Sequence, residues 1–235
     1  MTLSIGSNLK ESFNFAKDGL VGHWVRWLAL IIISIIPIVN FIAPGYAVRI
    51  YRGVSYAPDL DDWFGLFIDG LQVIVIAFVY MIIPLFLIVV GIAIIIYGMV
   101  GDDISSMVGG IALAVIGAIL AFALGFLFIM GCVRFAKTDS MREAFNFGVI
   151  TERIREIGWG SYILAYFVFS VLTGFINGIL SVLTHLSALT TLTDIFVEST
   201  ALTVIPLVGW LLTVIITPFL LIWQAKYFEN IYSLA

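Results

Sequence analysis

The sequence contains few charged residues. Only 11% of its 235 residues are charged, whereas a soluble domain carries roughly 25%. Hydrophobic residues make up 62% of the chain, and the mean hydropathy is +1.16. This shortage of charge excludes an ordinary soluble domain and indicates an integral membrane protein.

Cysteine and histidine are also scarce. The single cysteine, Cys132, excludes an intramolecular disulfide, and its apolar neighbours predict a small buried side chain. The two histidines, His23 and His185, fall on opposite sides of the predicted membrane and cannot share one site. The sequence has no zinc-ligand spacing, nucleophile elbow, phosphate loop or basic patch for nucleic acid. We therefore expect no cofactor and no nucleic-acid partner, and catalysis is disfavoured.

Long apolar segments dominate what is present. They cover residues 24–48, 71–99, 106–136, 159–183 and 201–225. About 20 helical residues cross a hydrocarbon layer of about 30 Å. The segments show no alternating polar face, so helices are favoured over a barrel. The sequence predicts one all-α, polytopic membrane domain over 1–235, with membrane lipids as its surroundings.

The basic residues predict the orientation. They fall in four stretches: Lys10, Lys17 and Arg26; Arg49 and Arg52; Arg134, Lys137, Arg142, Arg153 and Arg155; and Lys226. The positive-inside rule places these stretches, and hence both chain ends, on the cytoplasmic side of the cell membrane. The connections at 101–106 and 184–200 lack Lys and Arg, so we expect them outside.

The first apolar segment conflicts with a single crossing. If it spanned once and ended at Arg49, the basic residues before position 27 would lie outside. A re-entrant or broken helical hairpin avoids this conflict. It would enter over 24–36, turn at Pro37-Ile38-Val39-Asn40 and return over 41–50, because proline disrupts a helix. We predict four full spans plus this hairpin, with a single span as the alternative; Pro37 and Asn40 mark either a break or part of a pore.

Three amphipathic segments lie on the predicted cytoplasmic side, at residues 9–20, 60–71 and 141–149. In the third, Ser140 and Glu143 fit a capping box. Each segment is expected to be a helix that either lies flat in the membrane interface or packs on the underside of the bundle.

Small residues recur at four-residue spacing in two predicted spans. They are Gly110, Ala114 and Ala118, then Gly117, Ala121 and Gly125, and in the next span Ser170, Gly174 and Gly178. Small residues let helix backbones approach closely in lipid. These faces predict close packing, either within the chain or between copies in a homo-oligomer or larger membrane complex.

An acidic stretch follows the first apolar segment. Asp59 is expected to cap a helix that begins at Leu60, with Asp61 and Asp62 in its first turn. Arg49 and Arg52 would pair with these carboxylates and hold the loop, which ends at Trp63, against the membrane surface. The competing interpretation makes the three aspartates a divalent-cation site.

Two strings of residues around this stretch also resemble a known family. Gly45-Tyr46-Ala47-Val48-Arg49-Ile50-Tyr51-Arg52-Gly53 and Pro58-Asp59-Leu60-Asp61-Asp62-Trp63-Phe64-Gly65-Leu66-Phe67-Ile68-Asp69-Gly70, with their apolar surroundings, resemble the mainly archaeal integral membrane family named domain of unknown function 4013. The resemblance implies a polytopic membrane protein and no particular activity. A parallel internal repeat, over 7–70 and 140–230, is a further expectation from similar short strings in both halves.

Three functional hypotheses remain at this point. The favoured one is a non-catalytic membrane protein that self-assembles or acts as an accessory or scaffold subunit that organises the membrane. A channel or permease for a small uncharged solute is the alternative. A membrane enzyme that uses the Asp-rich cytoplasmic loop is the least favoured of the three.

Overall fold

The computed structural model describes residues 4–190 and 201–234; most of these are helical, and none of them forms a strand. The helices are α1 (Ile5–Leu20), α2 (Trp24–Ile35), α3 (Ile42–Tyr51), α4 (Trp63–Val100), α5 (Ile104–Thr138), α6 (Phe147–Ile157), α7 (Trp159–Thr190) and α8 (Ala201–Ser233). Two short 3-10 helices, η1 (Val39–Phe41) and η2 (Met141–Phe145), lie between them. The prediction of an all-α protein is confirmed.

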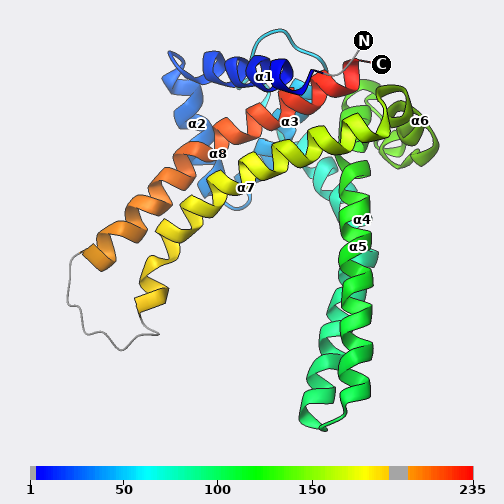
Figure 1. Cartoon of the computed structure of the whole chain (residues 1–235). Coiled ribbons are helices and arrows are strands. Elements are labelled where there is room, and N and C mark those ends of the chain that lie inside the picture. Colours follow the sequence, from blue (N-terminus) through cyan, green and yellow to red (C-terminus); the bar gives the residue numbers. More distant parts are fainter. Residues whose placement is uncertain (1–3, 191–200, 235) are drawn as a thin grey trace.

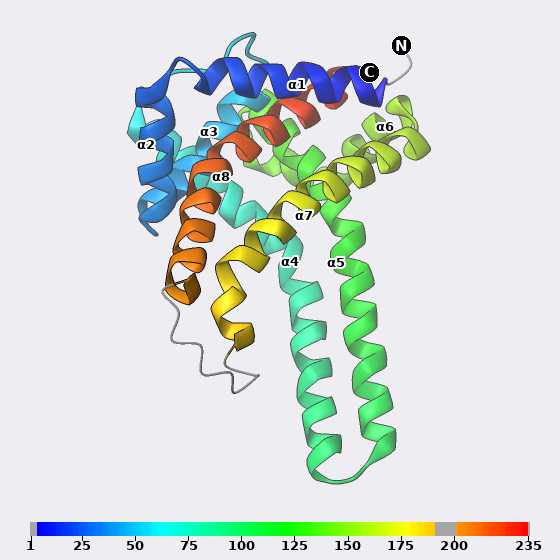
Figure 2. The same ribbon diagram turned by 60° about the vertical axis from the view of Figure 1, so that its left-hand side comes forward.

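The long helices form two antiparallel pairs. α4 packs against α5, and α7 packs against α8. Both pairs start from one end of the molecule, which we call the head; it carries α1, α6 and both chain ends (Figure 1). Away from the head the two pairs diverge, and α7 and α8 run at a slant to the far part of α4 and α5 (Figures 1 and 2).

Four helices are long and apolar enough to cross a membrane. They cover Trp63–Val100, Ile104–Thr138, Trp159–His185 and Val204–Ser233. At about 1.5 Å per residue, each is longer than the hydrocarbon layer of about 30 Å. The predicted multi-pass membrane protein with four full spans is therefore confirmed.

The first apolar segment is broken. α2 ends at Ile35, and after a turn and η1 the chain runs back towards the head as α3 (Figure 2). Each helix is too short to cross alone, with 12 residues in α2 and 10 in α3. Pro37 lies in the turn between them, where its missing N–H group breaks no helical hydrogen bond. A sharp bend of 98° also separates α1 from α2.

α3 lies at the centre of the head. Eight of its ten residues are buried, against α4, α8, α5 and α2. Where α3 crosses α4, a Cβ atom on Gly45 would overlap the carbonyl of Leu66, and one on Gly70 would overlap the carbonyl of Phe41. Only glycine at both positions allows the two backbones to touch, which explains Gly45 in the first motif string and Gly70 in the second.

The first amphipathic segment packs on the bundle as α1. It crosses α8, where the Phe13 ring meets the rings of Phe219 and Trp223 edge-on at centroid distances of 5.1 and 5.4 Å. Asn8 is buried, and its Nδ2 donates a hydrogen bond to the Tyr227 carbonyl at 3.1 Å. α1 is therefore joined to α8 by polar as well as apolar contacts.

The other two amphipathic segments differ from their predictions. Residues 60–71 form no separate helix, because α4 begins at Trp63 and continues without interruption. Residues 141–149 divide at Asn146 into η2 and α6. The predicted capping box is wrong: Ser140 makes no side-chain cap bond, and Glu143 instead accepts hydrogen bonds from Arg134. The charged hydrogen bonds from the Arg134 guanidinium to Glu143 are stronger than a bond from Glu143 to a backbone N–H would be.

Candidate functional site

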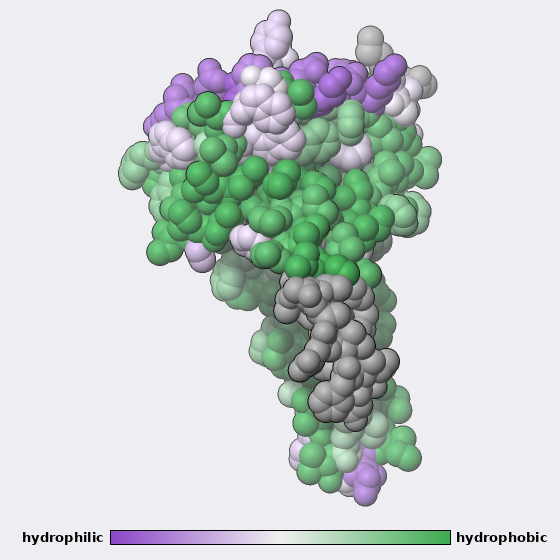
Figure 3. All heavy atoms as spheres, turned by 90° about the vertical axis from the view of Figure 1, so that its left-hand side faces the viewer, coloured by the Kyte–Doolittle hydropathy of each residue, from purple (hydrophilic) through white to green (hydrophobic). Residues whose placement is uncertain are grey.

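The charged side chains gather at the head. Figure 3 shows hydrophilic residues over the head and at the far tip, with a hydrophobic band between them. The far tip is the connection between α4 and α5, which contains Asp102 and Asp103. The Lys and Arg residues that lie far apart in the sequence therefore meet at one end of the molecule, where they face the carboxylates described next.

Arg49 fixes the loop that joins α3 to α4. Its guanidinium donates hydrogen bonds to the carbonyls of Asp59 and Asp61, at 3.0 and 2.9 Å, and to the Asp61 carboxylate. The Arg49 side chain is largely buried, while Asp61 is exposed. The hydrogen bond from Arg49 holds the pKa of Asp61 below its ordinary value. Asp61 therefore stays ionised at neutral pH as the partner of Arg49.

Arg52 joins three helices rather than the acidic loop. It donates to both carboxylate oxygens of Asp69 in α4, at 2.7 and 3.1 Å, and to Asp139 after α5 at 3.0 Å. This pairing differs from the expected one with Asp59, Asp61 or Asp62. The reason is geometric: Arg52 lies at the end of α3, beside the first turns of α4 and the end of α5.

The aspartates also divide their roles differently from the prediction. Asp59 caps no helix, because the residues after it are not helical; its carboxylate pairs with Arg26 of α2. Asp62 is the actual cap of α4. It has a left-handed backbone, with φ of 47°, and its side chain accepts a hydrogen bond from the Gly65 N–H at 3.1 Å. Trp63, the first residue of α4, is exposed.

This arrangement leaves little for metal chemistry. Within the described residues, no three His, Cys, Asp or Glu side chains lie close enough together to hold a metal ion. Asp59 and Asp61 each contact a different arginine, and Asp62 lies 3.8 Å from Arg49. Asp59, Asp61 and Asp62 therefore serve as anchors that tie the loop to α2, α3 and α4.

One buried charged group was missed from the sequence. Glu229 of α8 is 4% exposed and accepts hydrogen bonds from Lys226 at 2.8 Å, Lys137 at 2.9 Å and Ser233 at 2.7 Å. It borders a polar cleft of about 790 Å³ between α1 and the loop after α3. The available signal was Lys226 and Glu229 three residues apart at the end of an apolar span.

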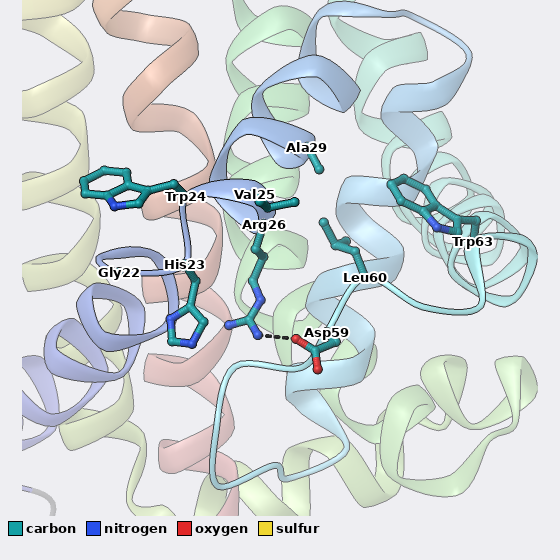
Figure 4. A pocket seen from close by; sticks show the side chains of 9 residues that line it. All are labelled: Gly22, His23, Trp24, Val25, Arg26, Ala29, Asp59, Leu60 and Trp63. Carbon is teal, nitrogen blue, oxygen red and sulfur yellow. Dashed lines mark hydrogen bonds and ion pairs between the residues drawn. The ribbon is translucent and has the colours of Figure 1, made fainter.

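A second pocket, of about 510 Å³, lies at the corner between α1 and α2 (Figure 4). It is lined by Gly22, His23, Trp24, Val25, Arg26, Ala29, Asp59, Leu60 and Trp63. The ion pair between Arg26 and Asp59 lies at one end, and the two indole rings lie on either side (Figure 4). Pro37 in the turn after α2 and Asn40 in η1 are exposed and line neither this pocket nor the cleft.

The small residues of α5 differ in whether they pack against α4. A Cβ atom on Gly110 would lie 2.6 Å from the Gly91 carbonyl of α4, and one on Gly117 would lie 2.9 Å from the Pro84 carbonyl. Ala114 also approaches Gly91. Further along, Ala118 is exposed, and Ala121 and Gly125 are half-buried. The first half of this face therefore packs within the chain, against α4.

The glycines among the small residues of α7 have no close neighbour within the described residues. Ser170, Gly174 and Gly178 are exposed, and a Cβ atom on either glycine would have no neighbour within 4 Å. The buried side of α7, which includes Ala165 and Phe169, faces α8 instead. The face of Ser170, Gly174 and Gly178 is thus open in the part of the chain that the structure describes.

A family model described as "Protein of unknown function (DUF4013)" matches residues 28–186. The match runs from α2 to α7. It includes Arg49 and Arg52 with their ion pairs, the acidic loop, and the small-residue faces of α5 and α7. α1 and α8 lie outside it. No curated protein and no solved structure matches the chain.

Proposed function

Because the chain belongs to the DUF4013 family, which is defined without a function, we propose a role from its geometry. We propose that it is a non-catalytic integral membrane protein that assembles with further copies of itself. The head would lie on the cytoplasmic side, as the clustered Lys and Arg residues favour. The hairpin of α2 and α3 would then be re-entrant from that side.

The observation that carries this proposal is the open face of α7. Two spans contain small residues at four-residue spacing, and α5 uses Gly110 and Gly117 against α4 inside the chain. α7 offers the same pattern with Gly174 and Gly178 exposed. Because lipid supplies no hydrophobic drive between helices, close backbone approach at such faces is a main source of association. A second copy is the partner that this face supports.

The ion pairs of the head support a structural rather than a catalytic role. Arg26, Arg49 and Arg52 each join different elements through carboxylates. The contacts of Arg26 and Arg49 hold the loop after α3 in place, and those of Arg52 join α3, α4 and the end of α5. A rigid head with two diverging helix pairs presents the α7 face to the membrane at a fixed angle, which suits a scaffold or accessory subunit.

The test is the Gly174→Leu variant, measured by native mass spectrometry in mild detergent. A Cβ atom at this position would have no neighbour within 4 Å among the described residues, so the fold should remain while the face is blocked. The expected result is a loss of oligomer relative to the unaltered protein. Gly109→Leu is the matched control, since Gly109 is an equally open glycine on α5.

The proposal would be wrong if the unaltered protein were monomeric in detergent and also in bilayers, as counted by subunit photobleaching. It would also be wrong if Gly174→Leu and Gly109→Leu gave the same oligomer as the unaltered chain. A disulfide cross-link between Gly174→Cys copies, absent for Ile179→Cys on another side of α7, would locate the contact. Cys132 is buried and does not compete.

A further inference from the structure

The pocket at the corner of α1 and α2 combines two kinds of surface. One end carries the charged pair of Arg26 and Asp59 (Figure 4). The wall is apolar and includes Val25, Ala29 and Leu60. A ligand that fits both surfaces has a charged head and a hydrocarbon part, as a membrane lipid has.

The position of the pocket agrees with such a ligand. Trp24 begins α2 and Trp63 begins the first full span, and their side chains are 64% and 46% exposed. Tryptophan is enriched where a membrane protein meets the lipid headgroups. The pocket therefore opens at the level where headgroup and acyl chain join, on the side of the head.

Arg26 has unused hydrogen-bonding capacity in this pocket. Its side chain is 11% exposed; one amino group donates to the Gly19 carbonyl at 2.8 Å and the other to Asp59. Its Nε is enclosed and has no partner among the described residues. A guanidinium has five N–H donors, and a buried donor without a partner costs about 1–3 kcal/mol. Nε is too enclosed for a ligand to reach, but each amino group has a second N–H that can donate to an acceptor in the pocket, and His23 lines the same end.

Asp59 decides which headgroup fits. Its side chain is 84% exposed although it pairs with Arg26, so a carboxylate remains open to a cation. A purely anionic headgroup would bring its charge beside this carboxylate. A zwitterionic headgroup offers a phosphate to Arg26 and an ammonium group to Asp59, which matches both charges.

We propose that this pocket binds one zwitterionic amino-phospholipid of the adjoining leaflet. Its phosphate accepts hydrogen bonds from Arg26 and His23, and its ammonium group donates to Asp59. One acyl chain lies along Val25, Ala29 and Leu60. This site is separate from the open face of α7, so it does not depend on self-assembly.

The experiment titrates the delipidated full chain with lipids of identical acyl chains and measures bound lipid by native mass spectrometry. The expected order is phosphatidylethanolamine before phosphatidylglycerol. Asp59→Asn should weaken phosphatidylethanolamine binding about tenfold, the size of one charge-assisted hydrogen bond. Asp18→Asn is the matched control, because Asp18 is exposed at the head and loses the same charge but does not line the pocket.

A second variant, Ala29→Leu, fills the apolar wall without changing any charge and should weaken all phospholipids alike. Thermal unfolding of each variant shows that the fold is retained. Equal affinity for the two lipids, or equal effects of Asp59→Asn and Asp18→Asn, would overturn the proposal. Competition by glycerophosphoethanolamine at the same concentration as the intact lipid would also overturn it, since the site would then bind a free headgroup.

Discussion

Gly45 and Gly70 set the distance between α3 and α4. A methyl group at either position would overlap a backbone carbonyl of the other helix, which cannot move aside as a side chain can. We predict that Gly70→Ala lowers the free energy of unfolding by about 3 kcal/mol, the upper range for overpacking. Thermal or denaturant unfolding in detergent measures this.

The control for that prediction is Gly109→Ala, because a Cβ atom on Gly109 meets nothing within 4 Å. It should leave stability unchanged or raise it slightly, since alanine favours a helix over glycine. Equal melting temperatures for Gly70→Ala and the unaltered protein would show that the backbones of α3 and α4 are not in contact at their crossing.

The pairing of Glu143 with Arg134 predicts that the stability of the protein depends on pH. Hydrogen bonding from Arg134 holds the pKa of Glu143 below its ordinary value of 4.5. A carboxyl group with a lowered folded pKa stabilises the fold above its unfolded pKa, and this contribution is lost as the pH falls through the folded pKa. Below pH 4.5 the melting temperature of the unaltered protein should therefore fall more steeply than that of Glu143→Gln.

Other carboxylates, such as Asp61, also titrate in this range, but both proteins share them, so the difference between the two curves isolates Glu143. Above pH 6 the two curves should run parallel, with Glu143→Gln lower. Parallel curves throughout the acid range would show that the pair of Arg134 and Glu143 contributes nothing to stability.

At the scale of elements, the pair of α4 and α5 depends on close backbone contact. Gly110 and Gly91 face each other across the two helices, with their backbones in contact. We predict that Gly110→Leu separates the helices and destabilises the protein by about 2 kcal/mol. Spin labels on exposed positions of α4 and α5, read by pulsed electron resonance, should show a longer distance.

Gly109→Leu again provides the comparison, since the neighbouring glycine faces away from α4. If both variants kept the distance of the unaltered protein, the small residues of α5 would not determine how this pair packs. If both lengthened it, the effect would come from the added bulk in lipid and not from the contact with α4.

The helices also show which breaks, starts and caps a sequence pattern can predict. The break near Pro37 was predictable because proline cannot continue a helix at full hydrogen bonding. The sequence pattern predicts that α4 starts three residues too early, at Leu60, with Asp59 as its cap. In the structure α4 starts at Trp63 and Asp62 is the cap. Any of these aspartates can cap a helix in isolation; Arg26 decides the choice by pairing with Asp59.

For the whole molecule, both chain ends lie at the head (Figure 1). The ion pairs of Arg26, Arg49, Arg52, Arg134 and Lys137 join elements there. We predict that the head faces the cytoplasm. In right-side-out vesicles, Asp102→Cys at the far tip should react with a membrane-impermeant maleimide, whereas Lys10→Cys should react only after the membrane is opened. Cys132 is buried and should give little background.

Labelling of Lys10→Cys from outside, with Asp102→Cys protected, would reverse the orientation. Labelling of both from outside would rule out the hairpin, because α2 and α3 would then cross the membrane as one span. The predicted internal repeat over 7–70 and 140–230 stays a prediction.

The sequence by itself determined the membrane class, the helical secondary structure, the four spans and the gathering of basic residues at one side. These features follow from hydropathy and local backbone chemistry, which neighbouring residues decide. Only the tertiary structure decided that Arg52 joins Asp69 and Asp139, that Glu229 pairs with Lys137, and that the small residues of α5 pack while those of α7 remain open. These contacts depend on which helices meet, and two helices with the same spacing of small residues carry no local signal of which partner each will find.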